Sequence, residues 1–187
     1  MRTCKNGGEG TIKTSKYVGF ILILVTLFAS SSFAFAWGDK SALRGLEGFH
    51  VQVEPLNSEI ERRGLTSSQI KEDVESRLRL AGISVLSNKE CWETKGEPRL
   101  IVAVNAIHVK LMDEQGGIKI VYPYHVEVRV AQLSYLVRPV KRDWRKIPAI
   151  TYVVSFTSVN PDLDRVRTMI KCLINTLIKD YLSMNPK

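Results

Sequence analysis

The sequence has no cysteine directly after its long apolar run, and this absence argues against a lipoprotein. The run extends from Tyr17 to Gly38 without one charged residue. Lipid attachment needs a cysteine immediately behind such a run, whereas Cys4 precedes it. Two further cysteines, Cys91 and Cys172, remain. In an oxidising compartment they are a candidate disulfide, with two free thiols as the alternative.

Motifs for catalysis and for metal binding are also missing. The chain contains no G-x-S-x-G, no H-E-x-x-H and no C-x-x-C, and its three histidines, His50, His108 and His125, lack metal-ligand spacing. The glycines of residues 113–117 are not followed by the Lys-Ser/Thr of a phosphate-binding loop. We therefore expect no enzyme, no cofactor and no metal site. A hydrolase whose site assembles only in three dimensions remains an alternative.

The apolar run has the texture of a signal peptide. Its strongly apolar part covers only residues 18–29, and three serines then lead to the small-x-small pattern of Ala34 and Ala36 before Trp37. Four basic residues and one acidic residue precede the run. We predict cleavage after Ala36, which makes residues 1–36 a signal peptide and places the protein in the periplasm. The alternative is an uncleaved inner-membrane anchor over residues 17–37.

Residues 37–187 are expected to form a single domain. Removal of the leader takes away four basic residues and one acidic residue, so the net charge falls from +8 to +5. This mild excess lacks the concentrated basic stripe of nucleic-acid binders. It is compatible with weak attraction to an anionic membrane surface. The expected partner is another envelope protein or envelope component, and not nucleic acid.

Periodicity predicts the order strand, helix, strand, strand, strand, helix. Residues 49–54 alternate as a half-buried strand. Thr66 and Gln69 predict a capping box for a helix that Gly82 ends. Residues 99–112, 118–137 and 149–159 read as strands, with a bulge near Ala131 and a loop over 88–98. Asn160 is the expected N-cap of a last helix with a wide apolar stripe.

Two one-sided helices and alternating strands predict an α+β fold, a two-layer sandwich with a mainly antiparallel sheet and both helices on one face. The other face would then be open. It would carry polar side chains of two strands, namely His50, Gln52, Glu54, His125, Glu127 and Arg129.

A basic loop is a second candidate contact surface. Trp144 is surrounded by Arg138, Lys141, Arg142, Arg145 and Lys146. Basic residues around an indole suit a partner or an anionic lipid surface. The alternative is a solvated connection whose charges discourage edge-to-edge aggregation.

Four stretches carry a resemblance to a known family. They are "LRGLEGFHVQVEPL", "GLTSSQIKEDVESRLRLAGISVLS", "PRLIVAVNAI" and "INTLIKDYLSMNPK", and the first helix and the ending from Asp180 to Lys187 are the most specific parts. The chain resembles a widespread family of short, Sec-exported bacterial periplasmic proteins, which supplies no catalytic residues. In element order it is also similar to the amino-terminal domain of TolB and to the lipopolysaccharide-assembly lipoprotein. These resemblances imply a non-enzymatic binding or assembly module of the envelope that acts through an open sheet face or a sheet edge.

Overall fold

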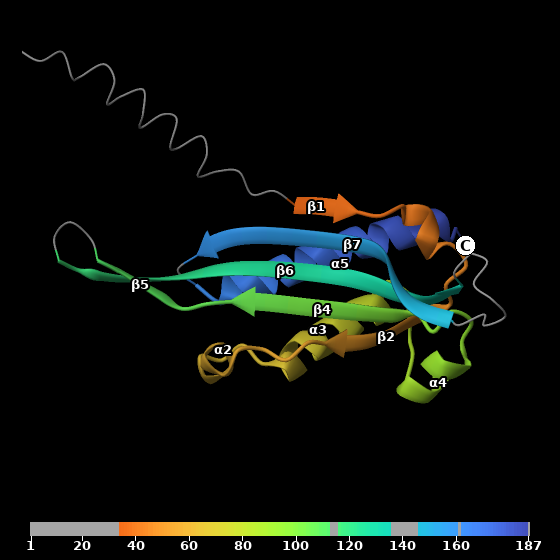
Figure 1. Cartoon of the computed structure of the whole chain (residues 1–187), viewed down its shortest axis with the longest axis horizontal. Helices are drawn as coiled ribbons and strands as arrows, with labels where there is room; N and C mark the ends of the chain where they lie inside the picture. The colour runs from red at the N-terminus through yellow and green to blue at the C-terminus, as the bar shows by residue number, and fades with distance from the viewer. Residues whose placement is uncertain (1–33, 113–115, 136–145, 161, 187) are drawn as a thin grey trace, which may run out of the picture. The chain divides into compact units, whose positions relative to one another are not determined.

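The computed structural model describes residues 34–112, 116–135, 146–160 and 162–186. They belong to one compact unit that runs from Phe33 to Lys187. In this unit helices pack on one face of a mixed sheet that does not close on itself (Figure 1). The predicted α+β fold class is confirmed.

The described sheet has the strand order β1-β7-β6-β4-β2-β3. Its bounds are β1 (Ala34–Trp37), β2 (Gly48–Val53), β3 (Ser84–Val85), β4 (Arg99–Ala106), β6 (Ile118–Tyr135) and β7 (Lys146–Asn160). The short strand β5 (Val109–Met112) pairs with the beginning of β6. Strand β2 runs parallel to β3 and to β4, and the other pairs are antiparallel. The sheet is therefore mainly antiparallel, as predicted.

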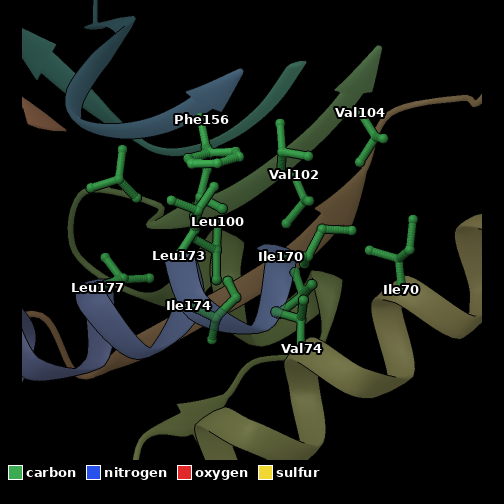
Figure 2. Packing of buried hydrophobic residues seen from close by; sticks show 14 of the residues in the cluster. Ile70, Val74, Leu100, Val102, Val104, Phe156, Ile170, Leu173, Ile174 and Leu177 are labelled. Carbon is green, nitrogen blue, oxygen red and sulfur yellow. The ribbon is translucent and has the colours of Figure 1, made fainter. Parts of the chain in front are cut away.

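The two long helices, α3 (Ser67–Leu80) and α5 (Asp164–Met184), cover the same face of the sheet. Figure 2 shows Ile70 and Val74 of α3 and Ile170 and Leu173 of α5 pointing toward the side chains of β4 and β7. These residues are at most 3% exposed. Full burial of each such side chain stabilises the fold by about 1.5–3 kcal/mol before conformational entropy is subtracted. The core thus lies between this helix pair and one sheet face.

Local sequence signals set the bounds of α3. The Thr66 hydroxyl accepts from the backbone N–H of Gln69 at 3.3 Å, and the Gln69 side chain accepts from the N–H of Thr66 at 3.2 Å. At the other end Gly82 has a φ of 74°, in the left-handed region that glycine tolerates without strain. The predicted capping box and helix end are both confirmed.

The end of α5 is fastened to the segment after the 3₁₀ helix η1 (Lys40–Leu43). The Asn185 side chain accepts from the Gly45 N–H at 2.7 Å and donates to the Leu43 carbonyl at 2.9 Å. The Tyr181 hydroxyl donates to the carbonyl of Leu46 at 2.5 Å. These bonds join residues about 140 positions apart, and we call them the C-terminal clamp.

Two further polar contacts hold α5 in place. The Tyr152 hydroxyl of β7 donates to the Asp180 carboxylate at 2.7 Å, and burial together with this carboxylate raises the pKa of Tyr152. On the side toward α3, Arg167 donates to both carboxylate oxygens of Asp73, at 2.5 and 2.9 Å. The Arg167 guanidinium holds the pKa of Asp73 below its ordinary value.

Two short helices were not predicted. Helix α2 (Ser58–Arg62) follows β2, and α4 (Asn88–Glu93) occupies the predicted loop over 88–98. Helix α4 has its own capping box, because Ser87 and Glu90 exchange side-chain and backbone hydrogen bonds. The spacing Ser87-x-x-Glu90 is the signal that could have revealed it.

The predicted strand over 99–112 is divided in two. Strand β4 ends at Ala106, and β5 begins only at Val109. The N–H of Ile107 donates to the carbonyl of Pro123 at 3.1 Å, but Pro123 has no N–H with which to continue the ladder. The predicted bulge is confirmed, since the β6–β7 register shifts between Val130 and Ala131.

The predicted N-cap of the last helix was wrong. Helix α5 begins at Asp164, and its N-cap, Leu163, makes no side-chain capping bond. Asn160 instead accepts from the N–H of Asp162 at 3.2 Å, and Asp162 accepts from the N–H of Asp164 at 2.9 Å. Two successive side-chain turns therefore replace the single expected cap.

Candidate binding surface

The sheet face opposite α3 and α5 carries an ordered row of charged side chains. Arg129 of β6 pairs with Glu54, the residue directly after β2, and its Nε lies 3.3 Å from Oε1 of Glu127. Glu127 Oε2 lies 3.5 Å from Nε2 of His125. His125 Nδ1 in turn lies 2.8 Å from the hydroxyl of Thr157 on β7. The predicted polar face is thus present as a chain of contacts across the sheet.

Strand register explains how Arg129 reaches Glu54 over the intervening strand β4. In β4 the residue opposite Glu127 is Ala103. Its methyl side chain leaves room for the guanidinium to cross β4. Such partly exposed ion pairs contribute at most about 1 kcal/mol each. Their main effect is to fix alternating charges over the centre of the face.

One end of the same face is apolar. A pocket of about 330 Å³ lies between α4 and the ends of β4, β6 and β7. Its apolar walls are Trp92, Ile101, Ala131, Leu133 and Pro148, and its polar residues are Gln52, Glu97, Arg99 and Gln132. Trp92 is 59% exposed, and the Arg99 guanidinium lies 4.8 Å from the centre of its ring. Sequence reasoning missed this pocket because it placed Trp92 in a loop.

A second hollow, of about 630 Å³, adjoins this pocket. The two share Trp92, Glu97, Gln132 and Leu133. The other lining residues of the second hollow come from the segments 44–47 and 93–96, and most of them are polar or charged. An apolar pocket and a polar hollow therefore meet at one exposed indole.

The outer edge of β7 is the other notable feature. Residues 147–160 contain no charged side chain. On the side away from β6, the one described strand that pairs with β7 is β1, over Val153–Phe156. Ile150 and Val159, outside that paired stretch, are 55% and 59% exposed. Edge strands of soluble proteins usually carry charges or other devices that prevent further pairing.

The residues of the predicted cleavage site form β1. Ala34 is paired with Phe156, Ala36 with Val154, and Trp37 with Val153. Cleavage after Ala36 would remove three of the four residues of this strand. Residues 34–36 therefore belong both to the predicted signal peptide and to strand β1 of the sheet.

The hairpin of β5 and β6 is a further exposed apolar segment. Leu111, Met112, Ile118 and Ile120 are between 38% and 81% exposed. Nothing in the structure shows what would cover this hairpin.

Both candidate disulfide cysteines are free thiols in the structure. Cys91 is wholly buried in α4, and its thiol donates to the carbonyl of Pro98 at 3.6 Å. Burial raises the pKa of this thiol, which lowers its reactivity. Cys172 is exposed on α5.

The histidines occupy three different environments. His50 and His125 share the open face, as predicted from their parity. His108, by contrast, is largely covered, and its Nδ1 lies 3.2 Å from a Glu59 carboxylate oxygen. Within the described residues no cluster of His, Cys, Asp or Glu could hold a metal ion.

The basic loop lies outside the described residues in large part. Residues 138–145, with Arg138, Lys141, Arg142, Trp144 and Arg145, are not described, and Lys146 is the first residue of β7. In the parts of the chain that the structure describes, no helix has the length and apolarity to cross a membrane.

No family model and no curated protein matches the chain. Among solved structures, the chain is similar to the Evf virulence factor, with 8% identity over 89% of this chain and a TM-score of 0.24. The alignment spans only 61% of that protein. The chain is also similar to rare lipoprotein B from Shewanella oneidensis, with 17% identity over 72% of this chain and 89% of that one, and a TM-score of 0.25. These likenesses are loose ones of fold, and they carry no argument about function.

Proposed function

We propose that the protein is a non-enzymatic periplasmic binding or assembly module, exported by the leader of residues 1–36 and cleaved after Ala36. In this proposal it binds an extended segment of another envelope protein by adding a strand to the outer edge of β7. Backbone hydrogen bonds would give the affinity, and side chains at alternate positions would give the selectivity. The observation that carries the proposal is the edge of β7 over residues 147–160, which has no charged side chain and which, in the described chain, pairs with β1 over Val153–Phe156 and meets Gly38 at Thr151 and Tyr152.

The composition of β7 supports a docking role for its edge. Outside the stretch paired with β1, the uncharged residues 147–160 of β7 leave outward N–H and C=O groups for a neighbouring chain. Pro148 is the only residue of residues 147–160 that lacks an N–H. In a periplasmic protein such an edge invites aggregation unless a partner covers it. A regular partner therefore explains why this edge carries no charges.

Strand β1 supports the choice of partner, because it is an example of a strand that pairs with the outer edge of β7. It runs antiparallel to β7, and its residues in register with the buried side chains of Val154 and Phe156 are alanines. Residues opposite each other in an antiparallel pair lie on the same face of the sheet. The expected partner segment is thus extended and uncharged, with small residues at the two positions that adjoin the core.

The test uses the protein purified from the cell envelope and a labelled peptide with the sequence of residues 31–37, Ser-Ser-Phe-Ala-Phe-Ala-Trp. The mass of the purified protein should correspond to a chain that begins at Trp37. We expect saturable binding of the peptide, measured by fluorescence anisotropy, and protection of the amides of residues 153–156 from hydrogen exchange. Absence of binding by a folded protein of this mass refutes strand addition at β7.

Two matched control peptides test the geometry. In an antiparallel pair the residues of one strand bond alternately toward the neighbour and away from it. N-methylation at Ala34 and Ala36, or at Phe35 and Trp37, therefore removes donors of opposite parity. One of the two peptides should lose at least tenfold in affinity and the other should not. Equal behaviour of both peptides contradicts pairing through the backbone.

The second candidate is a membrane-tethered domain. The pairing of β1 with β7 in the intact chain favours it, because that strand persists only when residues 34–36 are retained. Residues 17–37 would then be an uncleaved signal anchor, and the basic loop with Arg142 and Arg145 would contact anionic lipid. A purified protein that retains Met1 and resists carbonate extraction supports this candidate and excludes the first. Loss of liposome binding in Arg142→Glu and Arg145→Glu variants would support the lipid contact.

A further inference from the structure

We infer that the two hollows around Trp92 form one binding site for a single-chain amphiphile with a zwitterionic head group. The alkyl chain would lie in the 330 Å³ apolar pocket, and the head group in the adjoining 630 Å³ hollow. This site lies on the open face at α4, apart from the outer edge of β7. The inference therefore does not depend on strand addition.

The apolar pocket is suited to one alkyl chain. Its volume lies at the low end of the range of about 300–1,000 Å³ that is usual for ligand sites. Side chains from four strands and α4 line it, with Ile101, Leu133 and Trp92 as the largest apolar members. A second chain would have to remain in water. A single-chain ligand thus fits the pocket better than a two-chain lipid.

The site is held open by contacts that do not involve a ligand. The capping box of Ser87 and Glu90 fixes the start of α4, and Cys91 anchors its buried side. After α4, the Gly96 carbonyl accepts from the N–H of Leu133 at 2.7 Å, which ties the next turn to β6. Because the walls are fixed in advance, binding would cost little conformational entropy.

Gln132 closes the boundary between the two hollows. The bulge at Ala131 turns its side chain toward η1 and β7, where its amide donates to the carbonyl of Ala42 at 2.9 Å and to the Thr151 hydroxyl at 2.8 Å. Both donors of this amide are thus used within the protein. The exposed indole of Trp92 remains as the surface at which chain and head group would meet, a position that suits an amphipathic ring.

The charges of the larger hollow favour a zwitterion. Its lining includes the bases Arg44 and Lys95 and the acids Glu47, Glu93 and Glu97. Of these acids, Glu97 already lies 3.7 Å from Arg99, and Glu93 lies 4.0 Å from Lys89. The two bases and Glu47 remain to face a ligand, so both signs of charge are still present. A head group with a positive and a negative charge, such as phosphocholine, finds an opposite charge in the hollow for each of its own. A purely anionic head group would be repelled by the acids, and a purely cationic one by the bases.

The experiment measures quenching of Trp92 by terminally brominated dodecylphosphocholine below its micelle concentration. The full chain carries Trp37→Phe and Trp144→Phe, so that Trp92 is the only indole. We expect saturable quenching, weakened at least tenfold by Leu133→Asp, which places a charge in the apolar wall. Leu80→Asp, at an 88% exposed position of α3, is the matched control and should leave the affinity unchanged. Circular dichroism verifies that both variants are folded.

The head group is tested with brominated dodecyl sulfate and brominated dodecyltrimethylammonium. Both should bind at least fivefold more weakly than the phosphocholine probe. Quenching that rises linearly without saturation, or falls equally in the Leu133→Asp and Leu80→Asp variants, overturns the site. Equal affinity for all three probes overturns the assignment of a zwitterionic ligand. If Leu133→Asp does not fold, Arg44→Glu with Lys95→Glu should reverse the head-group preference toward the cationic probe, and an unchanged preference contradicts the inference.

Discussion

The C-terminal clamp predicts a large effect for a single substitution near the end of the chain, Asn185→Ala. The Asn185 side chain makes three hydrogen bonds, with Gly45 at 2.7 Å and with the carbonyls of Leu43 and Tyr181 at 2.9 Å each. The net contribution of one such bond is about 0.5–1.5 kcal/mol. Gly45 is exposed, so water would replace part of the loss. We therefore expect the free energy of unfolding to fall by about 2 kcal/mol.

Urea denaturation followed by circular dichroism measures this change. For a domain of 150–250 residues, 2 kcal/mol corresponds to a fall in Tm of about 4–8 °C. Asn185→Asp should lose about as much, since a carboxylate still accepts from Gly45 but cannot donate to the two carbonyls. Ser183→Ala is the control, because the Ser183 hydroxyl makes only a local bond to the Asp180 carbonyl at 2.7 Å. A loss below about 0.5 kcal/mol in Asn185→Ala, equal to the control, would refute the clamp.

Three further substitutions test the two long helices and the contact between β2 and β3. Asp73→Asn removes an ion pair worth about 0.5–1 kcal/mol. Arg167 lowers the pKa of Asp73 in the folded protein below its ordinary value of 3.8. The ion pair therefore contributes in full at a pH above 3.8, and its contribution disappears as the pH falls through the lowered pKa. Urea titrations of the variant and the wild type should thus give the same stability in acid. Thr66→Ala should cost about 1 kcal/mol by loss of the N-cap, measured by the same titration at neutral pH. Gly48→Ala should cost about 1–3 kcal/mol by thermal melting, because a Cβ there would collide with the backbone carbonyl of Ser84.

The features that could be predicted from the sequence are those with local causes. The bounds of α3 follow from Thr66, Gln69 and Gly82, which lie within 17 positions of one another. The parity of His50 and His125 follows from strand alternation, which needs no knowledge of the neighbouring strand. The bulge at Ala131 was visible as a change in the phase of apolar residues. In each case the deciding contacts lie within one element.

The features that were missed depend on register between distant strands. The break between β4 and β5 is caused by Pro123, which lies in another strand and was read only as an irregular start. Arg129 reaches Glu54 because Ala103 happens to lie between them, and no local pattern shows that. The clamp of Asn185 on Gly45 likewise joins the two ends of the domain. The sequence from Asp180 to Lys187 was recognised as a specific part of the resemblance, but the contacts of Asn185 could be seen only in the folded structure.

Under the proposed function, the segment 34–37 would have two roles that exclude each other. A signal peptidase and the edge of β7 both need this backbone extended, so the strand cannot be held by both at once. We expect its removal to affect the edge and not the core, since within the described residues β1 pairs with β7 alone, whereas β2, β4, β6 and β7 with α3 and α5 form the core. A chain that begins at Trp37 would thus free Val154–Phe156 of that edge for a partner, and a chain that keeps Met1 would cover these residues with its own residues 34–36. The mass of the native protein therefore decides both where the domain is held and whether β7 is free to bind.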